Sequence, residues 1–223
     1  MGHLKRILCF GDSNTWGLFA GTNQRYDWGI RWTSRLQIAL AEFGFQIIEE
    51  GLCGRTTVYE DPYRRGRAGI DMLPELLESH RPLDLVILML GTNDCKTCYS
   101  QKPLEIGQGA ARLVDEIQAS LPQCRILLVS PILLGDDVWK EGYDPEFSPV
   151  SVETAKALPE VYKALAARRG IEFLAASEYA APSAADQEHM DGEGHERLAK
   201  AMMRKVLEMF RQEREDNTQV NTP

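Results

Sequence analysis

A serine, a histidine and an aspartate stand at positions from which they could carry out nucleophilic catalysis. Ser13 follows the apolar run Ile-Leu-Cys-Phe at 7–10 and a Gly-Asp pair. A serine hydroxyl is a weak nucleophile and needs a base within hydrogen-bond reach. In Asp186-Gln187-Glu188-His189, the carboxylate three residues before the imidazole can fold back onto Nδ1 and leave Nε2 for a serine. The spacing predicts Ser13 as the nucleophile, His189 as the base and Asp186 as the group that orients the base.

Each of these assignments has an alternative. Ser13 could serve only as a helix N-cap, a position that serine favours. His195, with Asp191 four residues before it, is a rival base. Gly194 and the apolar stripe that follows place His195 at the start of the last predicted helix, so triad geometry favours His189.

Three candidate donors for a developing oxyanion follow the ends of three predicted strands. They are the N–H of Ser13, the N–H of Gly54 and the side-chain amide of Asn93. Acyl transfer requires such preorganised donors, and losing one typically costs about 10²–10³ in turnover. Taken singly, Gly54 could be only a turn glycine and Asn93 a turn amide that bonds its own backbone.

Short apolar runs alternate with amphipathic segments along the chain, and this alternation predicts the fold. It is typical of an α/β protein with a mainly parallel five-stranded sheet covered by helices on both faces. The carboxyl ends of such strands share one edge, where ligands bind, so Ser13, Gly54 and Asn93 should converge there. The expected strands are 7–10, 45–48, 83–90, 125–130 and 171–174, and the expected helices are 28–43, 70–79, 104–121, 152–169 and 194–210.

Length and charge limit the possible partners. The 223 residues fit a single domain, expected over 1–210 and followed by a polar tail, 211–223. The net charge of −8 argues against nucleic acid or an anionic membrane surface as a partner. No apolar run is long enough to cross a bilayer, and the apolar start is too short for a signal peptide.

The five cysteines are an odd number in a chain without an export signal, which predicts reduced thiols and a cytoplasmic location. Cys95 and Cys98 form a lone C-x-x-C pair with no second pair at zinc-site spacing. The sequence therefore predicts neither a metal site nor a cofactor.

A long connection, about 133–150, precedes the fourth predicted helix. Connections of this length inside a compact domain are usually functional or disordered. It carries Trp139, Tyr143 and Phe147 among acidic residues. With Trp16, these aromatic side chains are expected to line the substrate pocket, although ordinary packing would explain them equally well.

Four segments of the chain together resemble the SGNH (GDSL) hydrolase family. They are Gly-Asp-Ser at 11–13, Gly54, Gly-Thr-Asn-Asp at 91–94 and Asp-x-x-His at 186–189, in the family's order and at similar spacing. The resemblance implies a flavodoxin-like, three-layer α/β/α fold and ester hydrolysis by Ser13, His189 and Asp186. It also implies an oxyanion hole formed by Ser13, Gly54 and Asn93.

Further segments, such as Thr-Trp-Gly at 15–17 and Arg-Trp-Thr at 31–33, resemble the bacterial arylesterase and acyltransferase branch. This implies short acyl chains, possible acyl transfer to alcohols and a homo-oligomer. Asn14 and the 133–150 connection depart from that branch. Two alternatives stay open, a carbohydrate O-acetyl esterase and a non-catalytic flavodoxin-like module that binds phosphate or nucleotide. The sequence contains neither a G-x-G-x-x-G nor a Walker A motif, which argues against the binding module.

Overall fold

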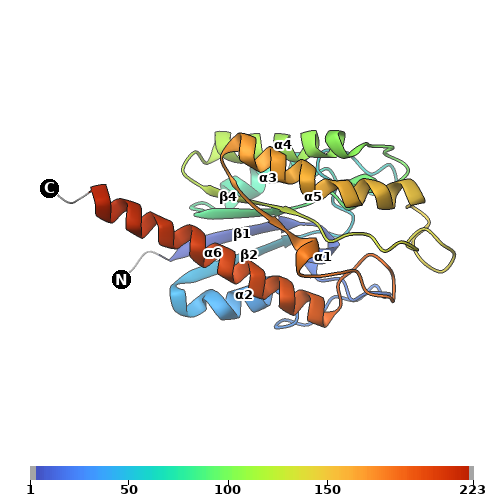
Figure 1. Ribbon diagram of the computed structural model, residues 1–223, viewed down its shortest axis with the longest axis horizontal. Coiled ribbons are helices and arrows are strands. Elements are labelled where there is room, and N and C mark those ends of the chain that lie inside the picture. Colours follow the sequence, from blue (N-terminus) through green and yellow to red (C-terminus); the bar gives the residue numbers. More distant parts are fainter. Residues whose placement is uncertain (1–3, 221–223) are drawn as a thin grey trace.

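The computed structural model describes the backbone of residues 4–220 and the side chains as far as Arg211. At its centre is a five-stranded, entirely parallel sheet with the strand order β2-β1-β3-β4-β5 (Figure 1). The strands are β1 (Lys5–Gly11), β2 (Phe45–Gly51), β3 (Leu85–Met89), β4 (Arg125–Ser130) and β5 (Glu172–Ala175). All five lie where the apolar runs predicted them.

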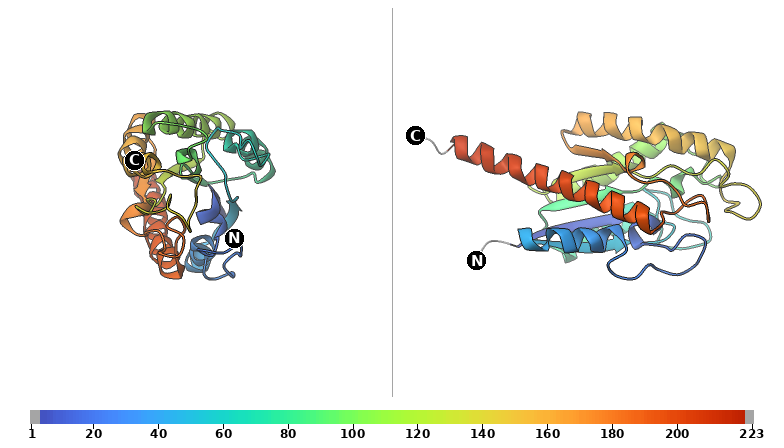
Figure 2. Two further views of the ribbon diagram at one scale, coloured as in Figure 1. Left: turned by 90° about the vertical axis from the view of Figure 1, so that its right-hand side faces the viewer. Right: turned by 60° about the horizontal axis from the view of Figure 1, so that its bottom comes forward.

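Helices cover both faces of the sheet. α3, α4 and α5 form one layer, and α2 and α6 form the other (Figure 2). The bounds are α1 (Ser13–Trp16), α2 (Trp32–Leu40), α3 (Gly69–Ser79), α4 (Pro103–Ser120), α5 (Pro149–Arg169) and α6 (Gly192–Val220), with 3₁₀ turns at Ala41–Phe43, Asn93–Cys95 and Ala176–Glu178. The predicted three-layer α/β/α fold is confirmed.

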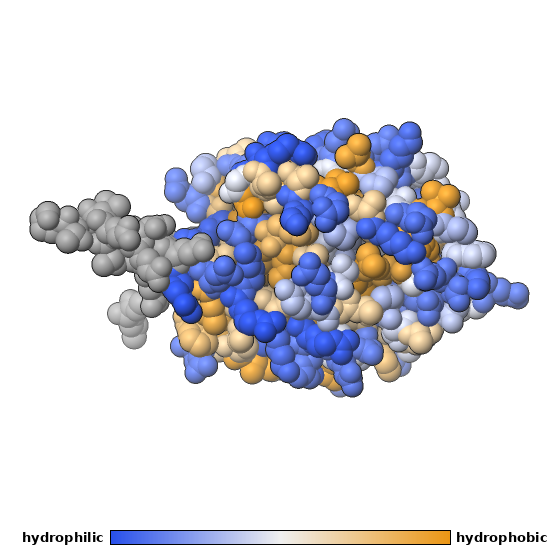
Figure 3. All heavy atoms as spheres, in the orientation of Figure 1, coloured by the Kyte–Doolittle hydropathy of each residue, from blue (hydrophilic) through white to orange (hydrophobic). Residues whose placement is uncertain are grey.

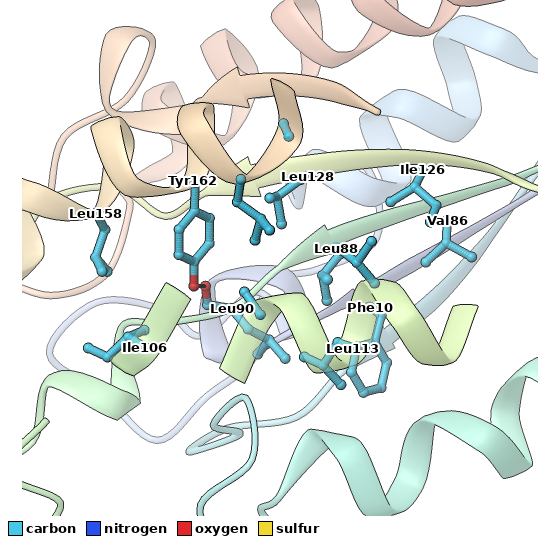
Figure 4. Packing of buried hydrophobic residues seen from close by; sticks show 14 of the residues in the cluster. Phe10, Val86, Leu88, Leu90, Ile106, Leu113, Ile126, Leu128, Leu158 and Tyr162 are labelled. Carbon is cyan, nitrogen blue, oxygen red and sulfur yellow. Dashed lines mark hydrogen bonds between the residues drawn. The ribbon is translucent and has the colours of Figure 1, made fainter. Parts of the chain in front are cut away.

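The hydrophobic core has two halves because successive side chains of a strand point to opposite faces. In β1, Leu8 and Phe10 pack under the α3–α5 layer, whereas Ile7 and Cys9 pack under α2 and α6. Figure 4 shows the first half, where the Tyr162 hydroxyl of α5 donates a 2.8 Å hydrogen bond to the Leu90 carbonyl at the end of β3. The buried phenol thereby keeps its hydrogen bond inside the core.

Each of the five predicted helices differs from its predicted bounds by at least one residue, and α5 begins at Pro149, three residues before the predicted start; α2 and α6 differ most. α2 begins at Trp32 instead of residue 28, because Arg31 is extended and Gly29 has a φ of +94°. α6 begins at Gly192 and continues to Val220, so the backbone of most of the predicted tail 211–223 is helical. Residues 221–223 lie outside the described part of the chain.

Two glycines let α1 sit directly on the ends of the strands. A Cβ on Gly51 would lie 2.1 Å from the Trp16 nitrogen, and one on Gly11 would lie 2.1 Å from the Thr15 hydroxyl. A side chain at either position would push α1 away from the sheet. The loops after β1, β4 and β5 gather at this same edge, on the right in Figure 1.

On the face that carries α6, hydrophobic side chains lie in groups between hydrophilic ones (Figure 3). Figure 3 shows hydrophilic residues over most of the face that carries α6. None of the helices in the described range is both long enough and apolar enough to span a membrane.

Candidate active site

Ser13, His189 and Asp186 meet at the carboxyl edge of the sheet. The Ser13 Oγ lies 2.8 Å from His189 Nε2, and Asp186 Oδ2 lies 2.9 Å from His189 Nδ1. Ser13 and His189 are 3% and 6% exposed, so the hydrogen bond between them is shielded from bulk water. The structure thus brings together two residues that are 176 positions apart.

The turn after β1 fixes the serine. Asp12, and not Ser13, is the N-cap of α1, since its carboxylate accepts a 3.0 Å hydrogen bond from the Asn14 N–H. The helix ends after one turn at Gly17, whose φ of +87° suits glycine. The N-cap alternative for Ser13 therefore fails, and its hydroxyl is free to face His189.

The loop after β5 holds the histidine. Asp186 Oδ1 accepts hydrogen bonds from the N–H groups of Glu188 (3.0 Å) and His189 (2.9 Å), while its other oxygen bonds the imidazole. Gln187 has a φ of +62°, uncommon for a residue with a side chain, and its carbonyl accepts from the Gly135 N–H at 2.7 Å. The 133–150 connection therefore helps to fix this loop.

The three residues predicted to supply oxyanion donors, Ser13, Gly54 and Asn93, all border one cavity. Within the described chain, neither the Ser13 N–H nor the Gly54 N–H has an acceptor. Gly54 has a φ of +81°, and the Asn93 amide donates one hydrogen to the Arg55 carbonyl at 3.1 Å, leaving its second free. Buried Asp94 ties these loops together by accepting from the Thr57 N–H.

Comparisons with known proteins agree with this geometry. Residues 9–197 match the model of the GDSL-like lipase/acylhydrolase family. The chain belongs to this family. It is a carboxylic ester hydrolase of the SGNH type, which rules out the non-catalytic binding module.

Two solved structures are similar to the hydrolase over nearly its whole length. Est24, a carbohydrate acetylesterase from Sinorhizobium meliloti, is 36% identical, with a TM-score of 0.85, and the match covers 92% of this chain and 99% of that one. The aryl esterase of M. smegmatis is 33% identical, with a TM-score of 0.86 and the same coverage. A search of curated protein sequences found no match.

Asn14 is a residue of the site whose role sequence reasoning missed. Its side-chain oxygen accepts a 3.0 Å hydrogen bond from the Met190 N–H, and its amide donates to the Glu188 carbonyl at 3.4 Å. The buried Asn14 side chain thus bonds the backbone on both sides of His189 and joins the serine turn to the histidine loop. The only indication of this role in the sequence was that Asn14 departs from the arylesterase pattern.

Replacing Asn14 by leucine should therefore lower both stability and turnover. The variant leaves the buried Met190 N–H without an acceptor, which costs about 1–3 kcal/mol in the free energy of unfolding. Urea denaturation measures that loss, and we expect kcat to fall because His189 is less firmly placed. A less stable variant with an unchanged kcat would contradict the positioning role of Asn14.

Charges around the hydrolase site set the pKa values of its acid–base groups. Burial alone would lower the pKa of His189, but the nearby carboxylates of Glu188 and Asp186 outweigh it and raise the value above 6.5. Burial alone would raise the pKa of Asp186, but hydrogen bonds from His189 hold it at about 2. Asp186 is therefore ionised at neutral pH.

His195 is not part of this constellation. It is fully buried, and its Nδ1 accepts a 3.3 Å hydrogen bond from the Trp32 N–H at the start of α2. Burial, together with the positive charge of Arg35, lowers its pKa to about 4. A neutral histidine that bonds the start of a helix has a structural role. This agrees with the sequence analysis, which placed His195 at the start of the last helix and favoured His189 as the base.

The cavity beside Ser13 has a volume of about 390 Å³ and a largely polar lining. Its lining residues are Ser13, Trp16, Leu18, Asn23, Cys53, Gly54, Arg64, Asn93, Lys96, Asp144, Glu146, Glu188 and His189. Trp16, predicted to line the substrate pocket, borders this cavity. Among the described residues, no group of three or more His, Cys, Asp or Glu side chains is arranged to hold a metal ion.

Trp139, Tyr143 and Phe147 do not line the cavity, which corrects the prediction for them. Phe147 is buried in the core under α5, and the Trp139 indole N–H donates to the Asp136 carbonyl within its own loop. The connection does reach the site, but through Asp144 and Glu146. Phe147 gains most by packing in the core, whereas Trp139 stays 38% exposed on the surface of its loop.

Proposed function

We propose that the hydrolase cleaves short-chain carboxylic esters through an acyl-enzyme on Ser13. His189 Nε2 takes the proton of the Ser13 hydroxyl as Oγ attacks the ester carbonyl, and then gives it to the leaving alcohol oxygen. Water, activated by the same nitrogen, releases the acid and regenerates the serine. Asp186 holds the imidazole and stabilises its protonated form. The pair of hydrogen bonds of 2.8 and 2.9 Å along Ser13, His189 and Asp186 carries this proposal.

The oxyanion formed at each step would be stabilised by the N–H groups of Ser13 and Gly54 and by the Asn93 amide. Both N–H groups lack a protein acceptor within the described chain, so they are available to the substrate oxygen. Asn93 is oriented in advance by its bond to the Arg55 carbonyl. Preorganised donors of this kind require no rearrangement during the reaction.

Covalent labelling tests the nucleophile directly. A fluorophosphonate should label wild-type protein once, at Ser13, and acetate esters present in excess should slow that labelling. The same reagent should leave a Ser13→Ala variant unlabelled. Labelling at another residue, or no labelling at all, would contradict the proposed acyl-enzyme.

Acetylated carbohydrates are a second candidate substrate class, favoured by the lining of the cavity. Arg64, Lys96, Asp144, Glu146 and Glu188 bring charged groups to it, and Asn23 adds an amide. Such a lining binds hydroxyl groups better than an aromatic ring. We expect kcat/KM for a monoacetylated sugar to exceed that for phenyl acetate, which a panel of the two esters would show.

The reaction should depend on pH through His189. Only the neutral imidazole accepts the serine proton, so kcat/KM falls as the pH falls through the pKa of His189. Because neighbouring carboxylates raise that pKa, the midpoint of the acid limb should lie above 6.5. Glu188→Gln removes one negative charge and should move the midpoint to lower pH. A midpoint that is unchanged in this variant would contradict the electrostatic account.

Three features expected from the sequence remain proposals. Acyl transfer to alcohols would use the same acyl-enzyme, and adding an alcohol would reveal it through formation of the new ester. We also propose that the protein forms a homo-oligomer, which analytical ultracentrifugation would test. We propose a cytoplasmic location as well, where the five cysteines would stay the free thiols that the structure contains.

A further inference from the structure

Glu188 is a buried carboxylate at the active site that takes no part in the proton transfers proposed above. Its side chain is 9% exposed, and it borders the cavity next to His189. Its backbone is fixed on both sides, with the N–H donating to Asp186 and the carbonyl accepting from Asn14. Within the described residues, no hydrogen bond reaches its carboxylate; the nearest ionic contact is His189 Nε2, 3.8 Å from Oε1.

A carboxylate in this position is costly unless a donor reaches it. Burial raises the pKa of Glu188 to about 7. The groups that face it are of both signs: His189 and Lys96 favour its charged form, and Asp144 and Asp186 oppose it. The Lys96 ammonium lies 2.6 Å from Glu146 Oε2, and among the described residues it makes no hydrogen bond to Glu188. The protein therefore leaves the acceptor positions of this side chain open toward the cavity.

The position of Glu188 relative to His189 determines which part of a substrate it meets. In the mechanism above, His189 Nε2 gives its proton to the leaving alcohol oxygen, so that oxygen must come within hydrogen-bond distance of Nε2. Glu188 Oε1 is 3.8 Å from the same nitrogen. The carboxylate is thus beside the alcohol part of the ester, within reach of a group on the carbon next to the ester-bearing carbon.

We propose that Glu188 is the specificity-determining residue for the alcohol part of the substrate, and that its carboxylate accepts a hydrogen bond from a hydroxyl on the neighbouring carbon. This inference rests on the proposed function, and it names the substrate class more narrowly: acetate esters of vicinal diols, including partly acetylated sugars. An alcohol part with only hydrocarbon at that carbon leaves the buried carboxylate without a partner, which disfavours simple alkyl esters.

Two small esters of equal size test the proposal. 2-Hydroxyethyl acetate and propyl acetate differ by one hydroxyl in place of one methyl group. The measured quantity is kcat/KM for 2-hydroxyethyl acetate divided by kcat/KM for propyl acetate. Both rates are measured by the release of acetate. We expect this ratio to fall about ten-fold from wild type to Glu188→Leu, the scale of a hydrogen bond to a charged acceptor. A change that only disturbs the fold would slow both esters alike and leave the ratio as it was.

Two further variants sharpen the test. Glu188→Gln keeps the shape of the side chain and one neutral acceptor, so its kcat/KM ratio should lie between those of wild type and Glu188→Leu. If Glu188→Leu does not fold, the ratio in Glu188→Gln tests the proposal in its place. Glu193→Leu replaces an exposed carboxylate outside the cavity and should leave the ratio at the wild-type value.

The outcomes separate the inference from the function beneath it. If both esters are hydrolysed and the ratio is the same in wild type and in the Glu188 variants, the role of Glu188 is overturned while the esterase proposal stands. A wild-type preference for propyl acetate that disappears in Glu188→Leu would overturn it as well, since the carboxylate would then repel the hydroxyl. If the wild type hydrolyses neither ester and Ser13 takes no fluorophosphonate, both proposals fail together.

Discussion

Ser13→Ala should lower kcat for acetate ester hydrolysis by about 10⁶, the scale of the loss when a serine hydrolase loses its nucleophile. Without Oγ no acyl-enzyme forms, and the oxyanion donors can only assist direct attack by water. Ser13 Oγ makes one side-chain hydrogen bond, to His189 Nε2, so its removal takes away little packing. Initial rates with p-nitrophenyl acetate measure the effect.

The fold of this variant should survive. Alanine favours helical conformation, and the N-cap of α1 is Asp12 and not the substituted residue. We expect the urea midpoint to move little from that of the wild type. Turnover close to the wild-type rate in correctly folded Ser13→Ala protein would contradict the proposed mechanism.

His189→Ala should lower kcat to a similar degree, because a serine without its base is almost as inactive as no serine at all. His189 is the only histidine that the structure places in contact with Ser13 among the described residues. The variant should also be labelled slowly by a fluorophosphonate, since the serine hydroxyl is no longer activated.

His195→Ala is the matched comparison, since both histidines are buried and are six positions apart. It should lower stability, because the Trp32 N–H loses its acceptor and a cavity opens in the core. Its kcat per labelled Ser13 should stay near the wild-type value. If His195→Ala were the inactive variant and His189→Ala kept its activity, our assignment of His189 as the base would be wrong.

Local patterns in the sequence were sufficient for the fold and for the candidate catalytic residues. The continuous apolar runs predicted all five strands, because strands of a parallel sheet are buried on both faces. The strand-end positions of Ser13, Gly54 and Asn93 predicted their convergence. The i, i+3 spacing of Asp186 and His189 predicted their contact, which lies within a single loop.

Features that depend on packing between distant segments were not predictable in this way. Asn14 bonds the backbone of residues 188 and 190, and no local pattern shows a contact across 174 positions. The aromatic residues of the 133–150 connection had equal reasons to face a substrate or the core. The tertiary structure placed Phe147 in the core and turned Asp144 and Glu146 toward the cavity.

The sequence alone therefore determined the order of the strands and helices along the chain and the side chains that we propose to react. Both follow from residue type and short spacing, which act within a few residues of chain. Only the tertiary structure decided that the cavity is polar, that His195 is structural and that the Glu188 carboxylate is open to a ligand. Burial and hydrogen-bond partnership depend on which distant segments pack together, and such packing is fixed only when the whole chain folds.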